Sequence, residues 1–134
     1  MTNINIYSHN LRGKFKIFVH EFESLLNRND LAIILSQDMG NIGPDGPHEL
    51  RQALTPHQVI TNATDANKSR NTEIILHKNW EIISVRKHES GGLIGAEIKN
   101  SNTTLLVMSA YLPTALDGLG MPESFDSRKK QTLR

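Results

Sequence analysis

The chain has 134 residues, of which 37% are hydrophobic and 22% are charged, a composition typical of one globular domain and not of a disordered chain. Its formal net charge is +1 and it has no cysteine, so charge alone indicates no nucleic-acid partner, and disulfides and thiolate metal sites are excluded. The N-terminus lacks the apolar core of a signal peptide, and no apolar run reaches the length of a membrane span. We therefore expect an intracellular protein, cytoplasmic or nuclear, with no membrane partner.

The first third of the chain predicts a strand, a helix and a second strand. Residues 4–8 alternate apolar and polar side chains, as strands do, and we expect a buried strand here. Residues 14–27 place apolar side chains at helical spacing: Phe15, Phe18, Val19, Phe22, Leu25 and Leu26. Residues 31–35 are apolar throughout, which is typical of a strand covered on both faces. This order predicts that the two strands are neighbours in a layered α/β domain.

The remainder predicts a loop followed by short strands. Residues 38–56 are rich in Gly and Pro and predict a loop with about one helical turn at 48–54. Residues 73–77, 80–86, 93–98 and 104–111 have strand patterns, with a turn at Gly91-Gly92 and a hairpin formed by the last two. A loop over 114–127 then leads to the start of a helix at 127–134, with Arg128, Lys129 and Lys130 on its exposed side. The chain shows no repeat and no interdomain linker, which predicts one domain.

Polar side chains stand at the C-terminal ends of three predicted strands. Asn10 ends the first, Gln37 and Asp38 follow the second, and Tyr111 ends the last. A carboxylate just past a buried strand can hold Mg²⁺ together with waters and phosphate oxygens, so Asp38 is the candidate metal ligand. Asn10 can donate its amide to a phosphate oxygen or orient the metal, and Tyr111 can donate its phenol hydrogen to the same phosphate. Gln37 is expected to point to the opposite face and to fix the neighbouring backbone.

Each of these residues also has a purely structural explanation. An Asp after a strand is commonly a turn or cap residue, and Asn10 before Leu-Arg-Gly is an equally good turn former. Tyr111 can bury its ring and leave its hydroxyl in water. The six histidines show no spacing typical of metal ligands.

In their order along the chain, these motifs resemble the endonuclease/exonuclease/phosphatase (DNase I-like) family. That family opens with a strand ending in Asn, here YSHNLRG at residues 7–13. Its second strand ends in a Leu-Gln-Glu-like motif, here Leu-Ser-Gln-Asp at 35–38, and a later strand ends in a Tyr-aliphatic-Pro motif, here Tyr-Leu-Pro at 111–113. The resemblance covers nearly the whole chain, and residues 111–123 are closest in style to endonuclease domains of non-LTR retroelements.

The resemblance implies an α/β fold, the N-terminal half of a four-layer sandwich, of which this chain would supply about one sheet and its first helix. It implies metal-dependent hydrolysis of phosphodiesters in nucleic acid, with Mg²⁺ or Mn²⁺ as cofactor. Asn10 would be the phosphate- or metal-orienting amide, Asp38 the metal carboxylate and Tyr111 the phosphate-contacting phenol.

Two features depart from the family pattern. Asp38 stands where the family has Glu, and its side chain is shorter by about 1.5 Å. The family's later Gly-Asp-(Phe/Leu)-Asn and Ser-Asp-His motifs are absent from the chain. We therefore expect residues 1–134 to be a single incomplete domain that is inactive alone, with exposed apolar surface and an open strand edge. A missing C-terminal half or self-association would cover that surface.

Two other functions stay open. One is a non-catalytic remnant or interaction module that keeps part of the fold without the chemistry. The other, within the same family, is a phosphoesterase acting on lipid or inositol phosphates. Salt-dependent binding of DNA would favour a nucleic-acid substrate.

Overall fold

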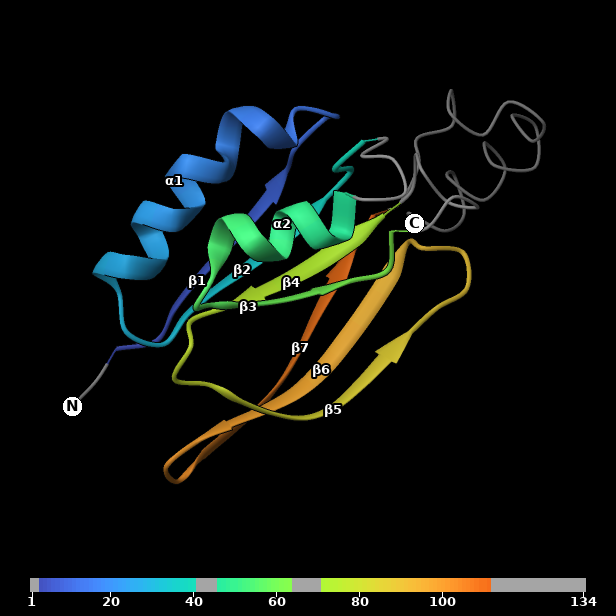
Figure 1. Ribbon diagram of the computed structural model, residues 1–134. Coiled ribbons are helices and arrows are strands. Elements are labelled where there is room, and N and C mark those ends of the chain that lie inside the picture. Colours follow the sequence, from blue (N-terminus) through green and yellow to red (C-terminus); the bar gives the residue numbers. More distant parts are fainter. Residues whose placement is uncertain (1–2, 41–45, 64–70, 112–134) are drawn as a thin grey trace, which may run out of the picture.

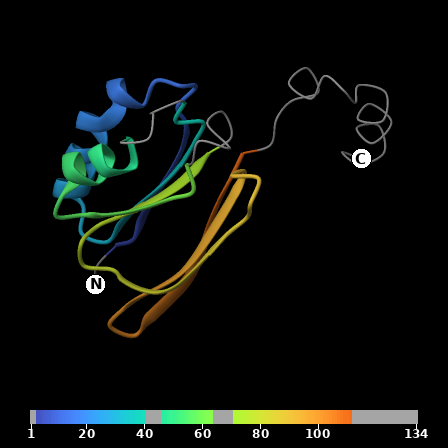
Figure 2. The same cartoon turned by 45° about the vertical axis from the view of Figure 1, so that its right-hand side comes forward.

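The computed structural model describes residues 3–40, 46–63 and 71–111, so the predicted loop and helix at 114–134, and Pro113, lie outside the described residues. Within these ranges two sheets pack face to face, and helices cover the outer face of one of them (Figures 1 and 2). Sheet A contains, in spatial order, β1 (Asn5–Asn10), β2 (Ala32–Gln37), β4 (Thr72–Leu76) and β3 (Gln58–Thr61), and sheet B contains β5 (Glu81–Lys87), β6 (Leu93–Asn100) and β7 (Thr103–Ala110).

The helices differ in how well the sequence predicts them. The predicted helix at 14–27 is confirmed as α1 (Phe15–Arg28), which buries Phe22 and Leu26. The segment predicted as a loop with one helical turn instead contains α2 (Gly46–Leu54), a helix of nine residues. Its Pro47 lies in the first turn, where the missing N–H costs nothing, so the Gly-Pro pair that suggested a loop begins a helix. No helix within the described ranges is long and apolar enough to cross a membrane.

The strands β1 and β2 are parallel neighbours, as the strand–helix–strand order predicts, with Asn10 paired to Gln37. The second strand is fully covered, but the expectation that β1 is buried is wrong. It lies at the edge of sheet A, where it pairs with β2 on one side within the described residues, and Ile6 is 55% exposed. The second strand also extends two residues beyond its predicted end, to Gln37.

The rest of the chain completes sheet A and builds sheet B. The strand β4 lies between β2 and β3, antiparallel to both, and the four-residue β3 was not expected because it falls beside the Gly/Pro-rich segment. Sheet B is an antiparallel meander that confirms the β6–β7 hairpin and the turn at Gly91-Gly92. The expectation of one sheet and one helix is therefore wrong: the described residues form two sheets and two helices.

Two apolar cores hold these layers together. The first lies between the helices and sheet A and contains Phe22, Leu26, Leu50, Leu54, Ile34 and Ile75 among others. The second lies between the sheets and contains Ile33, Ile74, Leu76, Trp80, Ile94, Ile98 and Val107 among others. Successive residues of β2 alternate between the two cores, since side chains of a strand point to opposite faces, and this explains the continuous apolar run at residues 31–35.

Candidate functional site

The strands β1, β2 and β7 end at the same edge of the sandwich, which we name the strand-end edge. The Leu11 N–H donates a 2.8 Å hydrogen bond to the Gln37 C=O, so the parallel strands β1 and β2 end side by side. From β7, the Ser109 Oγ donates to the Ser36 C=O at 2.9 Å and accepts from Gln37 Nε2 at 3.0 Å. The structure thus brings Asn10, Asp38 and the strand leading to Tyr111 to one edge.

The backbone of Asp38 is fixed at this edge from both sides. Its N–H donates to the Asn71 C=O at 2.9 Å, and its C=O accepts from the Gly13 N–H at 2.8 Å. Its φ is +57°, in the left-handed region that Asp and Asn enter more readily than most residues. The half-buried Asp38 therefore marks the point where the chain turns away from β2.

Asn71 holds the residues that follow Asp38, and sequence reasoning missed it. Its fully buried side chain accepts from the Met39 N–H at 2.7 Å and donates to the Gly40 C=O at 3.1 Å. A Cβ on Gly40 would lie 2.9 Å from the Gly13 Cα, so the turn after β1 and the turn after β2 are in direct backbone contact. This close packing fixes Asp38 relative to the end of β1.

The structure shows the turn role of Asn10. Its Oδ1 accepts a 2.9 Å hydrogen bond from the Arg12 N–H, and its side chain is exposed. The amide NH₂ group takes no part in this bond.

Tyr111 is half-buried and its N–H donates to the Gly92 C=O at 2.9 Å, which extends the β6–β7 pairing by one step. Gln37 Nε2 donates to the Leu35 C=O at 3.1 Å, which confirms that it fixes neighbouring backbone, and it also donates to Ser109 Oγ of sheet B.

Glu73 is a second residue that sequence reasoning missed. It is completely buried on β4, where Ser36 Oγ donates to its Oε1 at 2.8 Å and Thr61 Oγ1 donates to its Oε2 at 3.4 Å. Burial raises the pKa of this carboxyl to about 8, the hydroxyl groups of Ser36 and Thr61 oppose the shift, and the charge of Asp38 adds to it. At neutral pH the carboxyl therefore holds its proton most of the time, which does not suit a metal ligand.

The described residues form no complete metal site. They contain no group of three or more His, Asp or Glu side chains that could hold a metal ion. Asp38 offers one carboxylate, and the Asn10 oxygen is engaged with Arg12. Because Mg²⁺ is often held by one or two carboxylates together with waters and substrate phosphate, this donor set fits a water-rich site to which further groups contribute.

No family model and no curated protein sequence matches the chain. Among solved structures, the chain is similar to the endonuclease domain of TRAS1, a telomere-specific non-LTR retrotransposon, with a TM-score of 0.53 at 12% sequence identity. The chain has a DNase I-like fold. The match covers 97% of this chain and 54% of the solved one, so this chain spans about half the length of that domain.

This likeness confirms the fold class and the resemblance that the motifs indicated. At 12% identity it carries the fold alone. The roles of Asn10, Asp38 and Tyr111 stay predictions. Because the described residues contain no cluster of metal ligands, the metal site stays a prediction too.

Proposed function

We propose that this DNase I-like chain contributes part of the active site of a Mg²⁺-dependent phosphodiesterase that cuts DNA, and that the chain alone is inactive. The observation that carries the proposal is the convergence of Asn10, Asp38 and the end of β7 at the strand-end edge. The likeness of the fold to a solved endonuclease domain supports the reaction class.

Each residue has a role that its position supports. Asp38, half-buried and with its backbone fixed, would hold Mg²⁺ or Mn²⁺, and a bound ion would neutralise charge on the phosphate. The exposed amide of Asn10 donates to a phosphate oxygen from the neighbouring strand end. The phenol of Tyr111 donates to the same phosphate as negative charge develops there.

We propose that the chain alone is inactive because its described residues supply no suitable base for the attacking water. In-line attack by water requires a base within hydrogen-bond reach of that water. Glu73 carries a carboxyl that interacts electrostatically with Asp38, but it is buried, hydrogen-bonded to Ser36 and Thr61, and has a pKa of about 8. Since the chain spans 54% of the solved domain, the base would come from another part of a complete fold.

The test combines metal binding with a nicking assay. Binding of Mn²⁺, followed by the loss of the free-ion EPR signal, is expected to weaken at least tenfold in Asp38→Ala. It is expected to stay unchanged in Glu21→Ala, which removes an exposed carboxylate of α1 as the matched control. Supercoiled DNA in Mg²⁺ is expected to stay uncut by the chain and by Asp38→Ala alike.

Two outcomes contradict this proposal. Nicking by the chain alone that disappears in Asp38→Ala would show that the site is complete. Equal Mn²⁺ binding by the chain and by Asp38→Ala would remove Asp38 from the metal site.

A non-catalytic interaction module is the second candidate. The turn bond between Asn10 and Arg12, and the lack of a three-ligand cluster in the described part of the chain, favour it. This function would take the lead if Mn²⁺ binding proved independent of Asp38 and if DNA binding were absent at low salt. Binding of inositol phosphates in preference to DNA would favour the phosphoesterase within the family.

A further inference from the structure

The turn between β5 and β6, residues 88–92, lies at the strand-end edge. Both β5 and β7 run antiparallel to β6, so their C-terminal ends meet at the same edge of sheet B. The Tyr111 N–H donates to the Gly92 C=O, and a Cβ on Gly92 would lie 3.0 Å from the Tyr111 carbonyl oxygen. The β5–β6 turn is therefore in direct backbone contact with the candidate phosphate-contacting residue.

Sheet A holds the β5–β6 turn in place from the other side. Thr72 is fully buried on β4, and its Oγ1 donates to the Gly91 C=O at 3.0 Å. The buried Asn62 donates from Nδ2 to the Leu93 C=O at 3.2 Å, and its Oδ1 accepts from the Thr72 N–H at 3.0 Å. Because buried side chains of one sheet satisfy carbonyls of the other, the turn has a fixed position at the edge.

Hydrogen bonds within the turn set the state of the His88 ring. The Ser90 N–H donates to His88 Nδ1 at 3.1 Å, so Nδ1 carries no hydrogen. Ser90 Oγ lies 2.8 Å from the same nitrogen and accepts from the Gly92 N–H at 3.1 Å, which leaves the hydroxyl hydrogen for Nδ1. The ring is therefore neutral in this geometry, with its hydrogen on Nε2. Because Nδ1 already accepts hydrogen bonds, the ring does not act as a base through this atom.

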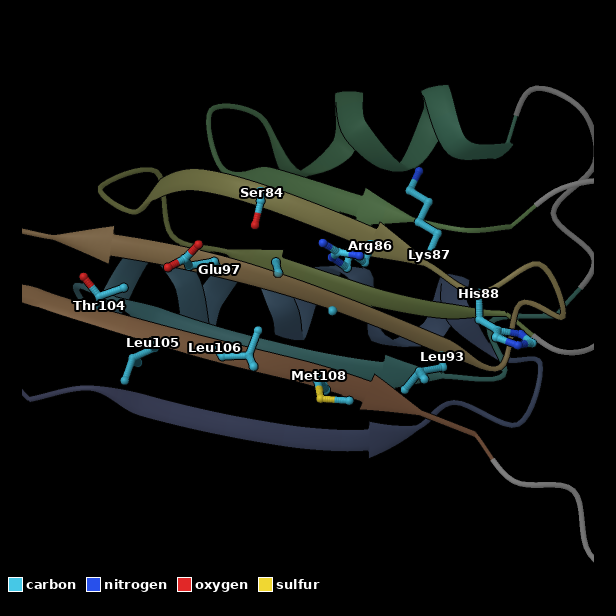
Figure 3. Close-up of a pocket in the computed structure, with 12 residues that line it drawn as sticks. Ser84, Arg86, Lys87, His88, Leu93, Glu97, Thr104, Leu105, Leu106 and Met108 are labelled. Carbon is cyan, nitrogen blue, oxygen red and sulfur yellow. The ribbon is translucent and has the colours of Figure 1, made fainter.

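The Nε2–H of His88 is open to a ligand. The side chain is exposed, and Nε2 has no hydrogen-bond partner among the described residues. Figure 3 shows His88 beyond the arrowheads of β5 and β7, at one end of the cavity of about 1010 Å³ on the outer face of sheet B. Arg86 and Lys87 precede it and Glu89 follows it, so cations outnumber carboxylates beside this donor. An N–H held in a fixed direction beside cations suits an anionic oxygen.

We propose that His88 is a further DNA-contacting residue, whose Nε2–H donates a hydrogen bond to a phosphate oxygen of a strand that crosses the strand-end edge. The identity of this ligand rests on the proposed function. In the order of the strands, His88 and Asn10 lie on opposite sides of Asp38 and Tyr111.

The phosphate at His88 is a different one from the phosphate at Asp38. The strand β5 lies two strands away from β7, roughly 10 Å at the usual spacing within a sheet. This distance exceeds the reach of one phosphate group, so His88 contacts a flanking phosphate. Contacts of this kind fix the register of DNA on a protein without reading its sequence.

His88→Asn separates the contact from the turn. Its Oδ1 still offers an acceptor to the Ser90 N–H, as Asn does in turns of this kind, but the Nε2–H is lost. Binding of a short DNA duplex at low salt in EDTA, followed by fluorescence anisotropy, is expected to weaken about tenfold, the usual effect of losing one hydrogen bond to a charged group. Urea unfolding is expected to stay unchanged. His20→Asn, at an exposed position of α1, is the matched control and is expected to leave both unchanged.

The salt dependence tests the neutral state of the ring. A neutral donor releases no counterion, so the slope of log binding constant against log salt is expected to be equal in the wild type and in His88→Asn. NMR of the chain with ¹⁵N-labelled histidine is expected to show His88 with a hydrogen on Nε2 alone, and this signal is expected to shift when DNA is added.

The outcomes separate this proposal from the proposed function. DNA binding that is equal in His88→Asn and in the wild type overturns the contact alone, as does a His88 ring with its hydrogen on Nδ1 in the free chain. Absence of DNA binding overturns the contact together with the nucleic-acid substrate. Because EDTA removes the metal, a failure of Asp38 as a metal ligand leaves the result at His88 unaffected.

Discussion

The Oγ of Ser36 donates a 2.8 Å hydrogen bond to the Oε1 of Glu73, and this bond joins β2 to β4 one residue below the strand-end edge. The C=O of the same serine accepts from Ser109 Oγ, which connects the bond to sheet B. A buried carboxyl thus holds the strand that leads to Asp38. Glu73 is therefore connected to the candidate site through covalent and hydrogen-bonded neighbours.

Glu73 is expected to make the chain less stable as the pH rises. Its pKa is raised from 4.5 to about 8 in the folded protein, so between these values the folded state binds the proton that the unfolded state has lost. Stability from this group is complete below about pH 4.5 and is lost as the pH rises through 8, with a slope of at most about 1.4 kcal/mol per pH unit.

Glu73→Gln keeps a group that can bond both hydroxyls but removes the titration. Urea unfolding from pH 5 to 9 is expected to show the variant overtaking the wild type in stability as the pH rises. An identical pH dependence for both proteins would mean that Glu73 is not protonated in the fold.

Acid is expected to destabilise the opposite end of sheet A through two buried histidines. The rings of His57 and His77 lie 4.9 Å apart, and burial lowers the pKa of both. His57 Nδ1 accepts from the Lys78 N–H, so protonation would break that bond. Asp30, 3.6 Å from His77 Nε2, opposes the shift of His77 in part.

Because the unfolded state binds protons more readily than these two histidines do when folded, stability is complete above about pH 6.5 and is lost as the pH falls below it. Replacement of both His57 and His77 by Gln is expected to remove this acid-dependent part of the unfolding free energy. The exposed His20→Gln on α1 is the control and is expected to leave it unchanged. Retention of the full acid dependence in the double variant would assign it to other groups.

Asn71→Ala is expected to lower the free energy of unfolding by about 2–4 kcal/mol, because it leaves the buried Met39 N–H and Gly40 C=O without their partner. Since the same residues follow Asp38, Mn²⁺ binding is expected to weaken as well. Urea unfolding and Mn²⁺ titration measure the two effects. Asn79→Ala, at an exposed position, is the control, and equal stability of both variants would contradict the role of Asn71.

Gly40→Ala is expected to destabilise the strand-end edge. Its Cβ would lie 2.9 Å from the Gly13 Cα, and its φ of +95° is unfavourable for alanine, which together cost about 1–3 kcal/mol. Gly95→Ala is the matched control, because its Cβ would meet the flexible Met108 side chain at 3.4 Å and the change is expected to stay within about 0.5 kcal/mol. Thermal unfolding of both variants measures the difference.

The sequence predicted those parts of the fold that local patterns specify. The helical spacing of Phe15, Phe22 and Leu26 and the apolar run of β2 were enough to predict α1 and its parallel strand pair. The division of the later strands into two sheets could not be predicted in this way. It depends on the turn at His77–Trp80, where the chain leaves sheet A, and on tertiary packing that no local pattern specifies.

The candidate site shows the same limit. Asn10, Asp38 and Tyr111 could be predicted as candidates because polar residues at the ends of apolar strands stand out. Asn71 lies just before β4 and Glu73 is its second residue, positions where polar residues are commonly exposed. Only the pairing of β4 between β2 and β3 buries them, and that pairing joins residues far apart in the chain.

Paramagnetic broadening by Mn²⁺ tests the central claim most directly, because it locates the ion on the chain. In ¹H–¹⁵N spectra, substoichiometric Mn²⁺ is expected to broaden the amide signals of Asp38, Gly40 and Leu11 and to spare that of Ile17 on α1. The broadening should disappear in Asp38→Ala. Broadening confined to the acidic residues of α1, or equal broadening in the variant, would contradict a metal site at the strand-end edge.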